Sequence, residues 1–143
     1  MIVGIDIHGV LDTYTADVLD FIKRVREENG NNSIYIITGP PEEQAKAELK
    51  KLGLKPNVHY DKVISVVDYL RQHLEEHDMW TDKNGHWWCA DKYWWCSKAR
   101  ICTEYKVDIL FDDSEKYLIG WDATNCKTEF WLVTNDKHIE RKR

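Results

Sequence analysis

The chain has 143 residues, 43% of them hydrophobic, a length that suits one folded domain with a single core. Its formal net charge of −5 gives none of the basic character typical of proteins that bind nucleic acids. No signal peptide or membrane-length apolar stretch is visible. We therefore expect one domain over residues 1–143, located in the cytoplasm.

The first third of the chain alternates short apolar runs with amphipathic segments. The run IVGID (2–6) predicts a buried strand, and apolar residues at helical spacing predict a helix over 15–29. The run SIYIIT predicts a second strand over 33–38. Residues 39–53 begin with prolines, continue with acids and lysines, and end in Gly53, which is the usual order of helix start and stop signals.

The middle of the chain is rich in aromatic residues. Residues 62–77 have a helical pattern, which a short third strand near 58–64 could precede. The turn-forming DKNG between aromatic flanks predicts a β-hairpin near 78–90. Asp91 is a suitable cap for another helix, which we expect to run through Tyr105.

The last third supplies two more apolar strands, KVDILFDD (106–113) and KTEFWLVT (127–134), and we expect the second to be the last strand. The C-terminal HIERKR has the composition of a solvated tail. Apolar strands that alternate with helices indicate a parallel sheet covered on both faces. The expected fold is α/β: a Rossmann-like three-layer sandwich with a mostly parallel central sheet and a small aromatic-rich hairpin.

Polar side chains stand at the ends of three of the predicted strands. Asp6 ends the first, Thr38 the second, and Asp112 with Asp113 the later one. Each residue alone could simply start a turn or cap a helix. Ligands of open parallel sheets, however, bind outside the carboxyl ends of the strands. Carboxylates gathered there repel unless a cation lies among them, and oxygen ligands of this kind favour Mg²⁺.

At these positions the sequence resembles the haloacid dehalogenase-like hydrolase superfamily, most of whose members are Mg²⁺-dependent phosphatases. IVGIDIHGVLD is similar to the first motif, IYIITG to the second and ILFDDS to the fourth. The three occur in the family's order over nearly the whole chain. The family's third motif is a lysine. Lys98 is our candidate because it interrupts an apolar stripe of the predicted helix, although a lysine there could also extend to solvent.

The resemblance implies a role for each motif residue. Asp6 would be the nucleophile that carries an aspartyl-phosphate. Thr38, Gly39 and Lys98 would bind the phosphoryl group, and Gly9 would permit the tight turn after the first strand. The implied Mg²⁺ ligands are Asp6, the His8 backbone carbonyl, Asp112 and Asp113.

His8 departs from the family pattern, because phosphatases of this superfamily usually have an acid/base aspartate two residues after the nucleophile. An imidazole, whose ordinary pKa is about 6.5, can donate and accept protons at neutral pH. We therefore expect a Mg²⁺-dependent phosphomonoester hydrolase in which His8 is the acid/base. The alternative is a weakly active or inactive phosphate-binding or regulatory protein, in which His8 marks a silenced site.

The sequence says less about the substrate. The segments between the motifs are too short for a substrate-selecting cap domain, so the resemblance is to a small capless member. Five of the seven tryptophans lie within residues 80–95. They could pack the hairpin on its neighbouring helix, or some could stack on a nucleobase. A phosphorylated small molecule, with a nucleotide or a nucleic-acid end as the first choice, is the expected partner.

Overall fold

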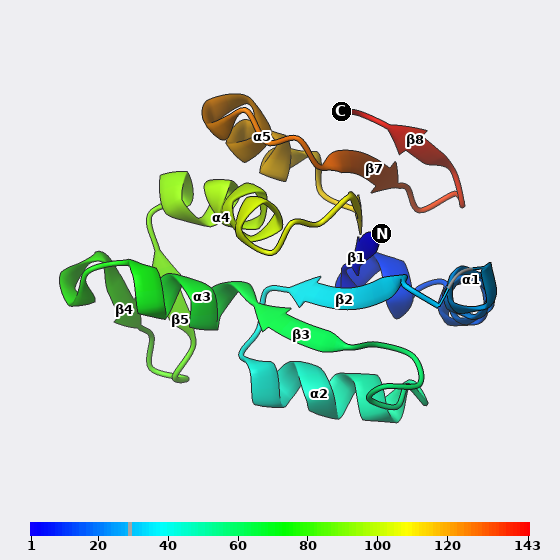
Figure 1. Cartoon of the computed structure of the whole chain (residues 1–143). Coiled ribbons are helices and arrows are strands. Elements are labelled where there is room, and N and C mark those ends of the chain that lie inside the picture. The colour runs from blue at the N-terminus through cyan, green and yellow to red at the C-terminus, as the bar shows by residue number, and fades with distance from the viewer. Residues whose placement is uncertain (29) are drawn as a thin grey trace.

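In the computed structural model, which describes residues 1–28 and 30–143, a mixed α/β fold surrounds one central sheet (Figure 1). The elements follow one another in this order: β1 (Ile2–Ile5), η1 (Ile7–Leu11), α1 (Thr15–Glu28), β2 (Ser33–Thr38), α2 (Glu42–Lys51), β3 (Lys62–Ser65), α3 (Val66–His73), η2 (Glu76–Asp78), β4 (Met79–Thr81), β5 (Trp87–Cys89), α4 (Asp91–Glu104), β6 (Ile109–Asp112), η3 (Glu115–Tyr117), α5 (Leu118–Thr124), β7 (Glu129–Val133) and β8 (Ile139–Arg141).

The central sheet has six strands in the order β3-β2-β1-β6-β7-β8. All neighbours pair in parallel except β7 and β8, which pair antiparallel. Strands β4 and β5 form a separate antiparallel hairpin. The predicted α/β class, the mostly parallel sheet and the small hairpin are therefore confirmed. Among the residues that the structure describes, no helix is long and apolar enough to cross a membrane.

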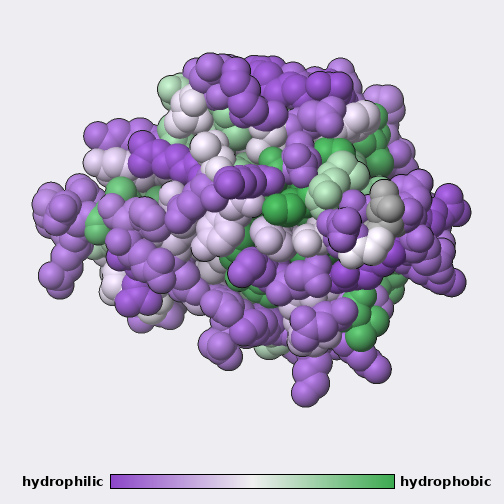
Figure 2. Space-filling view, in the orientation of Figure 1, coloured by the Kyte–Doolittle hydropathy of each residue, from purple (hydrophilic) through white to green (hydrophobic). Residues whose placement is uncertain are grey.

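Alternate residues of the strands belong to two hydrophobic clusters, as the two-residue period of a strand requires. Ile36 of β2 belongs to a cluster with residues of α1 and α2. The next residue, Ile37, belongs to a second cluster with residues of α3, α4 and α5. A strand whose odd and even positions are both buried appears in the sequence as a continuous apolar run. This is why the sequence predicted β2. Figure 2 shows hydrophilic side chains over most of the face seen in Figure 1.

Most element boundaries lie within a few residues of the predictions, and the strand over 33–38 is the same in both. Helix α1 covers 15–28 of the predicted 15–29; residue 29 lies outside the described residues. The predicted helix over 62–77 is shorter. Residues 62–65 form β3, and α3 ends at His73.

The end of the chain differs from the predictions. The strand β7 is not the last, because residues 139–141 of the predicted solvated tail form β8 against it. The three side chains of β8 are exposed, so no apolar pattern announced the strand. The short helix α5 was also not predicted. Its residues include the buried Gly120, where a Cβ would collide with the backbone of Cys96 in α4 at 2.7 Å.

Candidate active site

The carboxyl end of β1 turns sharply and leaves Asp6 buried at the edge of the sheet. The Asp6 backbone N–H donates to the carbonyl of Phe111 in β6 (3.1 Å), and its carboxylate accepts from the N–H of Ile7 (2.9 Å). His8 has extended dihedrals (φ −74°, ψ 125°) and Gly9 has φ +80°, so η1 is an irregular turn. This turn fixes the Asp6 carboxylate instead of continuing the strand.

Gly9 is required by the turn for two independent reasons. Its φ of +80° lies in the region that residues with a Cβ rarely adopt. A Cβ at this position would also overlap the carboxylate of Asp113, which follows β6. The Gly9 N–H donates to Asp12 Oδ1 (2.8 Å) and closes the turn. The glycine therefore allows the acids at the ends of β1 and β6 to approach one another.

Lys98 reaches this edge from α4 and is itself 1% exposed. Its ammonium donates a hydrogen bond to the Asp112 carboxylate and lies 3.4 Å from Asp6 Oδ1. It also lies 4.5 Å from the ring centroid of Tyr117. The prediction that Lys98 interrupts the apolar face of the helix is confirmed, and a solvent-exposed lysine is not what the structure contains.

Burial and mutual attraction set the pKa values in this cluster. Burial lowers the pKa of Lys98, but the carboxylates of Asp112 and Asp6 outweigh it and the net pKa is raised. Burial raises the pKa of Asp112 to about 6, against the opposing effect of Lys98. Burial, followed by the nearby charge of Asp112, also raises the pKa of Asp113. The pKa is raised for all three groups. The Lys98 ammonium stays protonated, and the carboxylates that share it are harder to ionise together than singly.

Asp6, Asp112 and Asp113 can each offer one carboxylate oxygen within 4.8 Å of the others. With all groups ionised, three carboxylates and one ammonium leave a formal charge of −2 at the site. Hard oxygen ligands with an excess of negative charge match a divalent cation such as Mg²⁺. The chemistry of the donor set therefore fits the metal that the sequence predicted.

Thr38 stands at the end of β2, the strand that neighbours β1. Its side chain is fully buried, and its hydroxyl has no hydrogen-bond partner within the residues described. Leaving a buried hydroxyl unpaired costs about 1–3 kcal/mol. The following residue, Gly39, accepts from the N–H of Val67 (3.1 Å), and a Cβ on it would lie 3.3 Å from the Trp94 ring. A ligand oxygen at this strand end would satisfy the hydroxyl.

His8 makes a contact that the sequence did not indicate. Its Nε2 lies 2.9 Å from Oε2 of Glu48 in α2, while its side chain is 53% exposed. The contact is an ion pair when the imidazole is protonated. Glu48 Oε2 has no hydrogen-bond partner among the residues described. Glu48 belongs to an ordinary run of charged helix residues, so no sequence signal distinguished it.

The structure thus brings Asp6, Lys98, Asp112 and Asp113 together and places Thr38 on the neighbouring strand. No protein-family model, curated protein or solved structure matches the chain. A buried lysine between carboxylates, with an unpaired hydroxyl at the end of a neighbouring strand, is an arrangement suited to binding an anion together with a cation.

Proposed function

We propose that the protein is a Mg²⁺-dependent phosphomonoester hydrolase, a small capless member of the haloacid dehalogenase-like superfamily. The observation that carries the proposal is the convergence of the Asp6, Asp112 and Asp113 carboxylates around the buried Lys98. Such a cluster is costly unless cation and phosphate charges complete it. Two core clusters on alternate strand residues support a Rossmann-like three-layer arrangement. The capless assignment is supported by the short segment between β3 and α4, which holds α3, η2 and the hairpin.

The metal would be held by the carboxylates of Asp6, Asp112 and Asp113 and by the backbone carbonyl of His8. Bound there, Mg²⁺ would neutralise phosphate charge, so that an anionic nucleophile could approach the phosphorus. The turn at Gly9 supports this assignment, since it lets Asp113 lie against η1. Lys98 remains protonated beside these acids and offsets their charge.

In the first half-reaction a carboxylate oxygen of Asp6 attacks the phosphorus. A bond forms between this oxygen and phosphorus, the bond to the ester oxygen breaks, and the leaving oxygen takes a proton from the His8 imidazolium. The Thr38 O–H donates a hydrogen bond to a phosphoryl oxygen, and Lys98 and the backbone at Gly39 hold the same phosphoryl group. The product on the enzyme is an aspartyl-phosphate.

In the second half-reaction water attacks the phosphorus of the aspartyl-phosphate. His8, now neutral, accepts the proton from the water, and the bond between phosphorus and the Asp6 oxygen breaks. Inorganic phosphate leaves, and Asp6 is again a carboxylate. His8 ends protonated, ready for the next leaving group.

The second candidate function is a catalytically weak phosphate-binding or regulatory protein. The contact of His8 with Glu48 favours it, because an imidazole held by a carboxylate of α2 could be turned away from a leaving group. Both candidates bind Mg²⁺ and phosphate at the same strand ends. They differ only in whether His8 transfers protons.

The deciding experiment measures phosphate release from a panel of phosphomonoesters with Mg²⁺ and with EDTA. We expect Mg²⁺-dependent release that falls to background in Asp6→Asn, and continues in Asp20→Asn, which changes an exposed acid of α1. Mg²⁺ should also raise the Tm of the wild type, and Asp112→Asn should remove most of that rise. A Mg²⁺- and phosphate-dependent Tm without any release would establish the binding protein instead.

A further inference from the structure

The five tryptophans of residues 80–95 divide into two groups. Three of them, Trp87, Trp94 and Trp95, pack against the second core cluster. The other two, Trp80 and Trp88, are 53% and 52% exposed. Packing of the hairpin on its neighbouring helix is the simplest explanation of the aromatic run. It explains the positions of three indoles but not the exposure of Trp80 and Trp88.

Trp80 and Trp88 lie directly opposite each other in the antiparallel pair β4–β5. Directly opposite residues of an antiparallel pair point to the same face of the ribbon. The other face is attached to the body of the protein. Met79 is buried there, and the guanidinium of Arg71 in α3 lies 4.3 Å from the centre of the Trp87 ring. One face thus anchors the hairpin, and the opposite face carries two neighbouring exposed indoles.

Hydrogen bonds hold the hairpin and one of its indoles in place. The Trp88 Nε1–H donates to Asp82 Oδ2 (2.9 Å). The other oxygen of this carboxylate accepts from the N–H groups of Asn84 (2.8 Å) and His86 (3.0 Å) in the turn. Because the ring is already fixed, a ligand that stacks on it has little side-chain freedom to remove.

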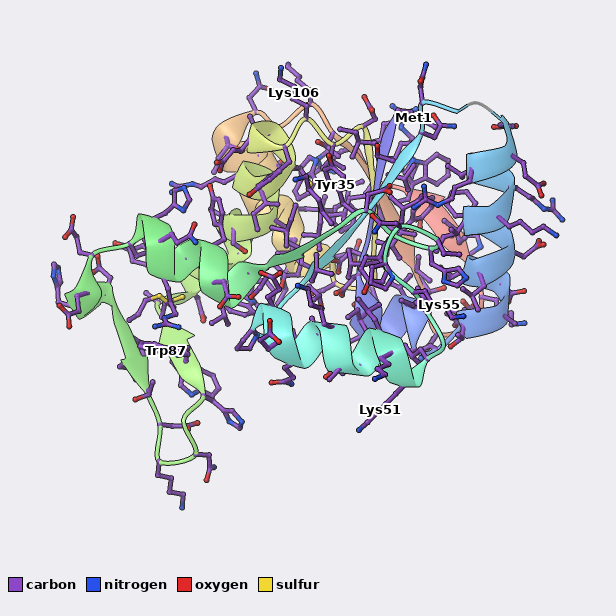
Figure 3. The ribbon with its side chains drawn as sticks, turned by 60° about the horizontal axis from the view of Figure 1, so that its bottom comes forward. Met1, Tyr35, Lys51, Lys55, Trp87 and Lys106 are labelled. Carbon is purple, nitrogen blue, oxygen red and sulfur yellow. The ribbon has the colours of Figure 1, made fainter. Side chains whose placement is uncertain are left out.

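The hairpin follows α3, which begins directly after the carboxyl end of β3 in the central sheet. In Figure 3, Met1 marks the start of the chain near the top, and the hairpin, labelled at Trp87, extends to the lower left beyond α3. The hairpin leads directly into α4, on which Lys98 follows Asp91 by seven residues, about 10 Å along the helix axis. Between them, Trp94 lies against Gly39, the residue after β2 whose backbone is proposed to bind the phosphoryl group.

The size of this exposed surface limits what could cover it. Two half-exposed indoles present roughly 250 Å², whereas a stable protein interface needs about 800 Å² on each partner. The remaining large hydrophobic side chains with high exposure lie outside the hairpin: Met1, Val58, Ile119 and Ile139. The surface matches a small planar ligand better than a second protein.

We propose that Trp80 and Trp88 form a stacking platform for the base of a phosphomonoester that carries a nucleobase. This inference rests on the proposed function, because it is the phosphate at Asp6 that would bring the base to the hairpin. Bases stack on aromatic rings whatever their sequence, and their sugar links them to the phosphate. A free nucleotide and the phosphorylated end of a strand share this chemistry.

The test compares binding of adenosine 5′-monophosphate and of ribose 5-phosphate, which lacks the base, to the Asp6→Asn protein with Mg²⁺ present, so that the cation is supplied and hydrolysis does not interfere. The variants below are made in this background. We expect the nucleotide to bind more tightly. Trp80→Leu and Trp88→Leu should each weaken it roughly 5- to 100-fold and leave ribose 5-phosphate unchanged. Trp80→Phe should retain most of the affinity. Ile119→Ser, which changes an exposed hydrophobic residue of α5, is the matched control.

Equal affinity for the two probes, or nucleotide binding that survives both leucine variants, would overturn the platform. Phosphate release from non-aromatic esters would then still support the proposed hydrolase, so the two failures can be told apart. A wild-type dimer that both leucine variants dissolve would also overturn it, because the occupant would be a second copy. A 5′-phosphorylated dinucleotide that binds more tightly than the mononucleotide would identify a strand end as the source.

Discussion

The acid–lysine cluster, formed by Asp6, Lys98, Asp112 and Asp113, buries charged side chains, whereas the hairpin exposes hydrophobic ones. Both are unusual in a folded protein, in opposite ways. The cluster buries charge, with Lys98 1% and Asp112 0% exposed, while the hairpin exposes two indoles to more than half. Proteins rarely bury a lysine without partners, and they seldom leave two neighbouring tryptophans in water. Each departure from ordinary burial costs free energy in the unliganded protein, and the proposed ligand would offset both, the phosphate at the cluster and the base at the hairpin.

The two regions also differ in what holds them. The cluster is assembled from β1, α4 and β6, so residues about 100 positions apart must come together for it to exist. The hairpin is made within residues 79–89 and is attached through one face. We therefore expect changes in the cluster to affect both activity and global stability, and changes on the exposed face of the hairpin to affect binding alone. The following variants test this difference, from the largest expected effect to the smallest.

The largest effect is expected from His8→Asn. The variant keeps the backbone carbonyl that would bind Mg²⁺ and loses the imidazole that would transfer protons. Turnover of alkyl phosphates should fall roughly 10²–10⁴-fold, while the Mg²⁺-induced rise in Tm survives. An aryl phosphate, whose leaving oxygen hardly needs a proton, should lose less. Unchanged turnover of alkyl esters by His8→Asn would exclude His8 as the acid/base.

Glu48 sharpens this prediction. An aspartate at position 8, the usual residue of the superfamily that the sequence resembles, would bring a second carboxylate toward Glu48, whose Oε2 now lies 2.9 Å from His8 Nε2. Aspartate is shorter than histidine, so the two carboxylates would lie farther apart than this, but neighbouring like charges still repel. We therefore expect His8→Asp to recover less activity alone than together with Glu48→Gln. If the wild type is nearly inert and His8→Asp alone activates it, His8 marks a silenced site. The second candidate function, a phosphate-binding or regulatory protein, would then be the correct one.

The next effect concerns stability. Lys98→Met removes the only ammonium that contacts Asp6 and Asp112 within the described part of the chain. Breaking a buried ion pair by removing one partner costs about 3–5 kcal/mol. Urea unfolding in EDTA should show this loss, and Mg²⁺ should restore part of it because the cation screens the same carboxylates.

Lys92→Met is the matched control for Lys98→Met, since Lys92 is exposed in the first turn of the same helix. Its free energy of unfolding should stay within about 0.5 kcal/mol of the wild type. Equal stability of the two variants in EDTA would mean that the cluster is not a coupled buried site.

The sequence could predict the parts that local patterns determine. The apolar run of β2, the turn residues of the hairpin and the apolar stripe around Lys98 are readable without any tertiary contact. The convergence of Asp6 and Asp112 followed from a rule for parallel sheets and not from the residues alone. Glu48, the strand β8 and the exposure of Trp80 and Trp88 depend on which segments meet in space. In the sequence they were indistinguishable from charged helix residues, a polar tail and core aromatics.

The smallest effect is expected in the hairpin, where Asp82 accepts the Trp88 N–H. This hydrogen bond, with those from the turn, lowers the pKa of Asp82 below its ordinary 3.8. A lowered pKa means that the ionised carboxylate stabilises the hairpin above about pH 4, and that this stabilisation is lost as the pH falls through the lowered pKa. Subtracting the tryptophan emission of Trp88→Phe from that of the wild type isolates the emission of Trp88. This difference should therefore change below pH 3.8. Asp82→Asn, whose amide oxygen can still accept but cannot titrate, should lack this change and keep the midpoint of global unfolding at neutral pH. A shifted global midpoint in Asp82→Asn would show instead that the hairpin supports the whole fold, and the difference between the two regions would disappear.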